Sequence, residues 1–170
     1  MRSAPSIGYF DCLSYSPLGD RGRIDAETEI NITAEKIDRD MRDISRVTSC
    51  IRTYSSTEGH ELIPAIAAKY GIRVMQGIWI DINQTKNVHE YENGIMLANT
   101  YHNVTHLIVG NEVMYFHRAT ELYLAALIED AKSRVHIPVT TGEIATTLEK
   151  YPFITRAVDF VMIHIFPYYD

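Results

Sequence analysis

The chain has 170 residues, of which 46% are apolar and 22% are charged, and its 16 basic and 22 acidic residues give a net charge of −6. This length and composition predict one domain, residues 1–170, with a substantial hydrophobic core. An acidic chain is poorly suited to nucleic acid, because contact with phosphates takes a basic face. No run of about 18 uncharged apolar residues occurs, so we expect no membrane span. Residues 1–6 contain no apolar stretch, so we also expect no signal peptide.

Short β-rich segments alternate with helical segments along the whole chain. Several of the β-rich segments are almost continuously apolar, which is typical of parallel strands covered by helices. We expect strands over Tyr9–Tyr15, Cys50–Tyr54, Arg73–Ile80, His106–Gly110, Ile137–Thr140 and Phe160–Phe166. The helices expected between them are Thr33–Ser49, Gly59–Tyr70, Asn87–Tyr101, Thr120–Val135 and Glu143–Tyr151.

Consecutive strand–helix units without a second compositional region predict either a doubly wound sheet or a (β/α)₈ barrel. Neither Gly-x-Gly-x-x-Gly nor Gly-x-x-x-x-Gly-Lys occurs, so the usual marker of nucleotide-binding sheets is missing. Cys12 and Cys50 cannot form a disulfide framework, and we expect both to be buried free thiols. No Cys/His spacing predicts a zinc site.

In a barrel, catalytic groups lie at the C-terminal ends of the strands. Glu112 stands out there, because it follows the buried strand that ends in Gly110 and Asn111. A carboxyl group in a partly desolvated pocket suits a general acid, and the neighbouring amide could bind a substrate hydroxyl. On local pattern alone, Glu112 could equally be a surface residue that caps the next helix.

Four aromatic residues near strand ends have flat apolar faces with polar edges, which suit stacking on sugar rings. They are Tyr15, Tyr54, Trp79 and Tyr168. Taken singly, such residues are also common core residues. His164 lies inside the last expected strand, and the phase of that strand does not decide whether its ring faces a pocket or the helices.

Five segments at the ends of expected strands resemble glycoside hydrolase family 17, the β-1,3-glucanases and β-glucan transglycosylases. In chain order they are Cys12–Pro17, Ile51–Tyr54, Gly77–Trp79, Val109–Val113 and His164–Tyr168. The resemblance covers about Gly8 to Asp170. It implies an α/β fold, a (β/α)₈ TIM barrel of which this chain supplies about six βα units, because a complete barrel needs roughly 200 residues or more.

The resemblance further implies retaining hydrolysis or transglycosylation of β-glucosidic bonds in a β-1,3-glucan, without a cofactor. Glu112 takes the acid/base position, and Asn111 contacts the sugar at the cleavage subsite. Tyr54 and Tyr168 match aromatic residues that line the cleft, and we add Tyr15, Trp79 and His164 as substrate-binding candidates. Relatives act on cell-wall or exported glucan, so an extracellular, cell-wall or periplasmic location is expected.

The family's nucleophilic Glu follows a seventh strand, which would lie beyond Asp170. We therefore expect this chain to be an N-terminal fragment that is inactive alone, and Asp81, Glu143 and Asp170 are poor substitutes for the nucleophile. An alternative is a vestigial protein that binds glucan without cleaving it. A third possibility is an α/β enzyme of another chemistry that uses Glu112 as a base.

Overall fold

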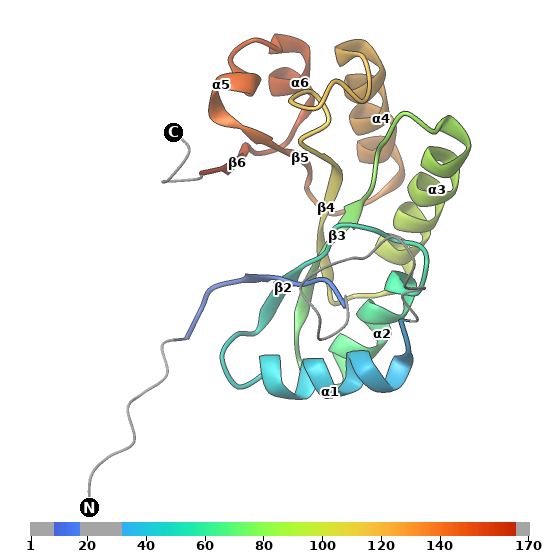
Figure 1. The fold of residues 1–170 in the computed structure, drawn as a ribbon, viewed down its shortest axis with the longest axis vertical. Coiled ribbons are helices and arrows are strands. Elements are labelled where there is room, and N and C mark those ends of the chain that lie inside the picture. The colour runs from blue at the N-terminus through green and yellow to red at the C-terminus, as the bar shows by residue number, and fades with distance from the viewer. Residues whose placement is uncertain (1–8, 18–31, 166–170) are drawn as a thin grey trace, which may run out of the picture.

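The computed structural model describes residues 9–17 and 32–165. Six parallel strands form one sheet whose spatial order equals their order in the chain, β1 to β6. The strands are β1 (Leu13–Ser14), β2 (Cys50–Arg52), β3 (Arg73–Ile78), β4 (Val104–Asn111), β5 (Val139–Ile144) and β6 (Met162–His164). The sheet curls into an open half-barrel, with the helices along its outer side (Figure 1). This arrangement confirms the predicted incomplete (β/α) barrel.

The helices follow the strands that they cover. They are α1 (Ala34–Ile44), the 3₁₀ helix His60–Leu62 with α2 (Ile63–Ala68), α3 (Gln84–Thr100), α4 (Glu121–Arg134), α5 (Ala145–Leu148) and α6 (Pro152–Ala157). Side-chain oxygens of Thr33, Asn83 and Thr120 accept a backbone N–H at the starts of α1, α3 and α4. Within the described residues, no helix is long and apolar enough to span a membrane.

The core consists of two apolar clusters between the sheet and the helices. One contains residues of α1, α2 and the first strands, with Ile37, Met41 and Ile51 fully buried. The other contains residues of β3 to β5, α3, α4 and α6, with Leu107, Leu124 and Ile128 among its buried side chains. These clusters hold the helices against the outer face of the sheet. The C-terminal ends of the strands remain available for a functional site.

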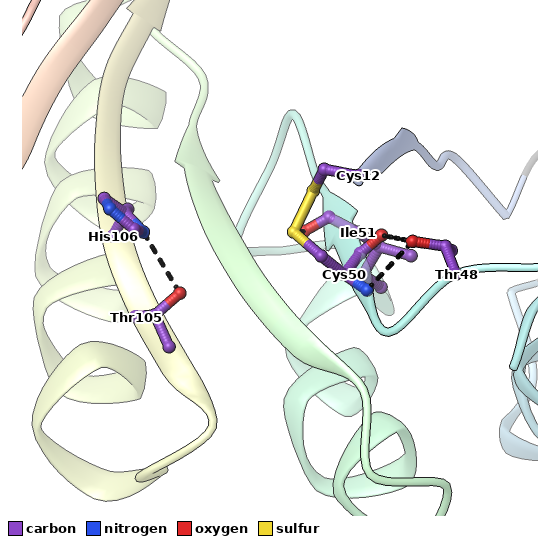
Figure 2. The surroundings of a disulfide bond; sticks show 6 residues. All are labelled: Cys12, Thr48, Cys50, Ile51, Thr105 and His106. Atoms are coloured by element: carbon purple, nitrogen blue, oxygen red, sulfur yellow. Dashed lines mark hydrogen bonds between the residues drawn. A yellow bond between two sulfur atoms is a disulfide. The ribbon is translucent and has the colours of Figure 1, made fainter. Parts of the chain in front are cut away.

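The predicted free thiols are wrong, because Cys12 and Cys50 form a disulfide (Figure 2). The strand register explains the pairing. Leu13 lies opposite Ile51 in the parallel β1–β2 pair, so the preceding residues, Cys12 and Cys50, also face each other. Their Cα atoms are 4.5 Å apart, which is within the distance that a disulfide needs. The bond ties the two-residue strand β1 to its neighbour.

The helix predicted over Glu143–Tyr151 forms only in the middle of that range, as α5 (Ala145–Leu148). Glu143 belongs to β5, and the segment after it forms the single turn of α5 followed by α6, which begins at Pro152. Proline is well suited to the first turn of a helix, because the missing N–H has no partner there. The residue expected to end a helix therefore starts one.

Candidate active site

The end of β4 directs Glu112 into a cavity through an unusual backbone path. Gly110 has a φ of +84° and Glu112 a φ of +52°, so the chain turns twice in the left-handed region. The ladder between β4 and β5 is irregular between Ile108 and Asn111. The Glu112 N–H then donates to the Gly142 carbonyl oxygen of β5 at 2.7 Å. A non-glycine residue in this region is strained, and such strain is common at functional sites.

The cavity has a volume of about 360 Å³ and lies at the C-terminal ends of β1, β2, β4 and β6. It is lined by Ser14, Arg52, Tyr54, Asn111, Glu112, Met162, Ile163, His164 and Ile165. Four predicted site residues thus come together here, namely Tyr54, Asn111, Glu112 and His164. The side chain of Glu112 is 13% exposed, and that of His164 is 15% exposed. The Nδ1 atom of His164 lies 2.7 Å from Oε1 of Glu112.

Arg52 connects the other residues of this cavity. Its Nη2 donates to the Oδ1 of Asn111 at 2.6 Å, and its guanidinium lies 3.8 Å from the centre of the Tyr54 ring. The side chain is 5% exposed, so the contacts are largely desolvated and correspondingly strong. Arg52 therefore fixes the amide of Asn111 and the aromatic face of Tyr54 in one arrangement.

Trp79 lies in a second cavity of about 620 Å³ that shares Tyr54 with the first. The lining residues of this second cavity also include Ser16, Asp81, Lys86 and Glu90. The guanidinium of Arg118 lies 4.7 Å from the centre of the Trp79 ring. Tyr54 thus lines both cavities, and Trp79 is the second aromatic residue of the larger one.

Glu90 on α3 fixes the backbone at Trp79. The sequence alone did not identify Glu90 as a residue of the site. Its carboxylate accepts hydrogen bonds from the hydroxyls of Ser55 and Thr57, from the Ser56 N–H at 2.9 Å and from the Trp79 N–H at 3.1 Å. Burial alone would raise the pKa of Glu90, but these donors outweigh it and hold that pKa below its usual range. One sequence signal for Glu90 was available, because it is a carboxylate next to Tyr91 on the face of α3 that packs against the sheet.

Tyr15 requires a correction, because it does not line either cavity. Its ring is 7% exposed and packs in the core cluster with Ile37 and Met41 of α1. Its hydroxyl donates to Asp40 at 2.8 Å. Since side chains alternate along a strand, Ser14 faces the cavity and Tyr15 faces the helices. Tyr168 and Asp170 lie outside the described residues.

Glu143 is completely buried beside the site and faces the turn that follows Glu112. Its Oε1 accepts the Met114 N–H at 2.7 Å. Burial raises the pKa of this carboxyl group to about 6, and the charge of Glu112 acts in the same direction. Glu143 does not line the cavity that Glu112 enters. Among the described residues, no group of three or more His, Cys, Asp or Glu side chains could hold a metal ion.

Comparison with known proteins places this chain in a family. No curated protein shows significant similarity to the chain. Two structures of a β-1,3-glucanosyltransferase from Rhizomucor miehei share its fold, each with a TM-score of 0.75 at 24% identity. One is described as a glycoside hydrolase family 17 enzyme, and the other as an active-site mutant in complex with laminaritriose. Each alignment covers 94% of this chain and 58% of the matched chain.

The family assignment rests on a model that spans nearly the whole chain. Residues 12–170 match the model described as the BtgE/BtgC glycoside hydrolase domain. The matched segment includes every residue of the Glu112 cavity. The chain belongs to the family of BtgE/BtgC glycoside hydrolase domains.

Proposed function

We propose that this domain cleaves or transfers β-glucosidic bonds of a β-1,3-glucan with retention of configuration, and that Glu112 is its general acid/base. The observation that carries the proposal is the position of Glu112. Its side chain is 13% exposed at the end of a central barrel strand, inside a cavity lined by amide, hydroxyl and aromatic groups. Such a lining suits a sugar ring, which presents hydroxyls at its edge and apolar faces.

In the first step Glu112 would protonate the oxygen of the leaving sugar, and in the second it would deprotonate a water or a sugar hydroxyl. His164 contacts Oε1 of Glu112, so Oε2 would be directed at the substrate. Asn111 would bind a hydroxyl of the sugar at the cleavage point, held in place by Arg52. Tyr54 and Trp79 would contact further sugar rings along the two adjoining cavities.

Retaining chemistry needs a second carboxylate about 5–5.5 Å from the first. Among the described residues, Glu112 is the one carboxylate that lines the smaller cavity, and Glu143 is engaged by the turn after it. The proposal therefore includes a nucleophile contributed by a residue outside 9–17 and 32–165. The glucan linkage, and a location outside the cytoplasm, belong to the same proposal. The Cys12–Cys50 disulfide supports that location, because such bonds persist in oxidising compartments.

The test is turnover of laminarin, a β-1,3-glucan, by the full natural protein that contains this domain. Glu112→Gln keeps the shape of the side chain but removes the carboxyl group that donates and accepts the proton, so turnover should fall by about 10²–10⁴-fold. Glucan binding should remain. Glu149→Gln, an exposed carboxylate on the neighbouring segment, is the control and should leave turnover unchanged. Equal turnover by wild type and Glu112→Gln would refute the acid/base role.

The same experiment addresses a second candidate function, a protein that binds glucan without cleaving it. The two aromatic-lined cavities favour this alternative as much as they favour catalysis. Saturable binding of laminarin by the wild-type protein with no reducing ends released and no transfer products would support the binding protein.

A further inference from the structure

Strand β5 approaches Glu112 with two consecutive residues that face opposite sides. A Cβ atom placed on Gly142 would lie 2.9 Å from Nε2 of His164 and 3.4 Å from Nη2 of Arg52, so position 142 faces the cavity. Side chains alternate along a strand, and Glu143 accordingly points away from the cavity. Its side chain is completely buried. A buried carboxylate on the outer side of the sheet needs a specific partner, because burial of an isolated charge is very unfavourable.

That partner is the backbone immediately after Glu112. The Met114 N–H donates to Oε1 of Glu143 at 2.7 Å. The N–H groups of Tyr115 and Val113 also stabilise the ionised carboxylate, although burial is the larger influence and raises its pKa. The Glu143 carboxylate therefore lies against backbone N–H groups of the turn that follows Glu112.

The turn that Glu143 holds is the one that fixes the direction of Glu112. Glu112 has a φ of +52°, which a residue with a side chain adopts only when the surroundings enforce it. The carbonyl of Gly142 binds the N–H of Glu112 from one side, and the carboxylate of Glu143 binds the next turn from the other. Two adjacent residues of β5 thus clamp the segment from 112 to 114.

We propose that Glu143 is a positioning residue, whose carboxylate holds the turn after Glu112 and thereby keeps the Glu112 side chain against His164 in the cavity. The inference deepens the proposed function, on which its consequence for catalysis rests. Glu143 touches no sugar and donates no proton to substrate. Its contribution is the orientation of Glu112.

The experiment uses nuclear magnetic resonance on the full chain, so that its result does not depend on activity. Glu143→Gln keeps the volume and removes the charge, Glu143→Met also removes the acceptor, and Glu149→Gln is the exposed control. Three signals are followed from pH 4 to 8. They are the Met114 amide shift, the Met114 amide exchange rate, and the ¹⁵N shift of His164 Nδ1, which reports the contact with Glu112.

In the wild-type protein the Met114 amide shift should follow a titration centred at a pH of about 6. In Glu143→Gln this titration should vanish and the His164 Nδ1 signal should move. In Glu143→Met exchange of the Met114 amide should also quicken by about tenfold or more, since a charge-assisted hydrogen bond is lost. A folded Glu143→Gln protein with an unchanged His164 Nδ1 signal would overturn the proposal, even if Glu143→Met failed to fold.

Kinetics separate a positioning role from failure of the proposed function. If Glu143 orients the acid, Glu143→Gln should lower kcat on laminarin at unchanged KM. The same substitution should have a much smaller effect on turnover of an aryl glucoside, because its phenolate leaves without protonation. Equal losses on both substrates would count against orientation of the acid. Failure of the proposed function would give a different result. Turnover by Glu112→Gln would then equal that of the wild type, whatever the His164 signal shows.

Discussion

His164 on β6 contacts Glu112 at the end of β4 by crossing over Gly142 of β5, the strand between them. Nδ1 of His164 lies 2.7 Å from Oε1 of Glu112. The contact is possible because position 142 has no side chain. A Cβ atom there would lie 2.9 Å from Nε2 of the same imidazole, closer than such atoms approach. The glycine therefore belongs to the geometry of the candidate acid.

Gly142→Ala should consequently displace the His164 ring and loosen Glu112. Gly142 has no positive φ, so the alanine backbone is unstrained and the protein should fold. We expect kcat on laminarin to fall by about tenfold to a hundredfold, as is usual when a catalytic group moves by roughly 1 Å. His136→Ala, an exposed histidine before β5, is the control. Wild-type kinetics in Gly142→Ala would show that the His164 contact is unimportant for turnover.

The Cys12–Cys50 bond should be a major source of stability for β1. It closes a loop with a sequence separation of 38, and a bridge of this span contributes about 2–4 kcal/mol. Replacing both cysteines by serine should lower the free energy of unfolding by that amount in a urea titration, and dithiothreitol should do the same to the wild type only. An unchanged urea midpoint in the double variant would contradict this expectation.

The periodicity of the chain was sufficient to predict parallel strands covered by helices, because each helix presents one apolar face and each inner strand is buried on both sides. It left a doubly wound sheet and a barrel open, and the resemblance to glycoside hydrolase family 17 indicated the barrel. Gly94 shows where such reasoning is limited. It lowers the helix propensity of α3, yet the helix forms. A Cβ at this position would collide with the Ile78 side chain. Close packing of α3 on β3 therefore requires the glycine, and tertiary contacts outweigh propensity.

The location of Asn111 and Glu112 in one cavity was predictable, because both residues follow directly from the end of a buried strand. The site was not predictable where register decides. The disulfide depends on which residues of β1 and β2 lie opposite each other, and the burial of Tyr15 depends on the face to which the chain turns directly after the two-residue strand β1. A shift of one residue would exchange both faces. Propensity alone does not fix the register of so short a strand.

Glu143 should make the protein less stable as the pH rises from about 4.5 to 6. Its pKa is raised to about 6 in the folded protein, above the value of an unfolded Glu, so the native state binds the proton more tightly. The stabilisation is complete below the unfolded pKa and is lost as the pH passes the folded one. The loss should be about 2 kcal/mol.

Urea unfolding at a series of pH values checks this expectation. The decline between about pH 4.5 and 6 should be missing from Glu143→Gln and retained in Glu149→Gln, whose carboxylate is exposed. A wild-type curve without a decline in this window would mean that Glu143 is ionised as readily in the folded chain as in the unfolded one.

Glu90 should show the opposite dependence. Its hydroxyl and amide donors hold the pKa of Glu90 below the ordinary value in the folded state, despite the opposing effect of burial. The stabilisation is therefore complete above the unfolded pKa of about 4.3 and is lost as the pH falls through the lower, folded value. Glu90→Ala leaves the donors of the 55–57 segment and the Trp79 N–H without their acceptor.

Each abandoned buried donor costs about 1–3 kcal/mol, so Glu90→Ala should lower the free energy of unfolding by roughly 2–4 kcal/mol at neutral pH. Trp79 should also lose its fixed position, because its backbone N–H is one of the released donors. Tryptophan fluorescence should then report a more mobile ring before global unfolding, and laminaritriose affinity should fall. Glu35→Ala, on the exposed side of α1, serves as the control. Unaltered stability and fluorescence in Glu90→Ala would mean that this carboxylate does not hold the aromatic wall of the second cavity.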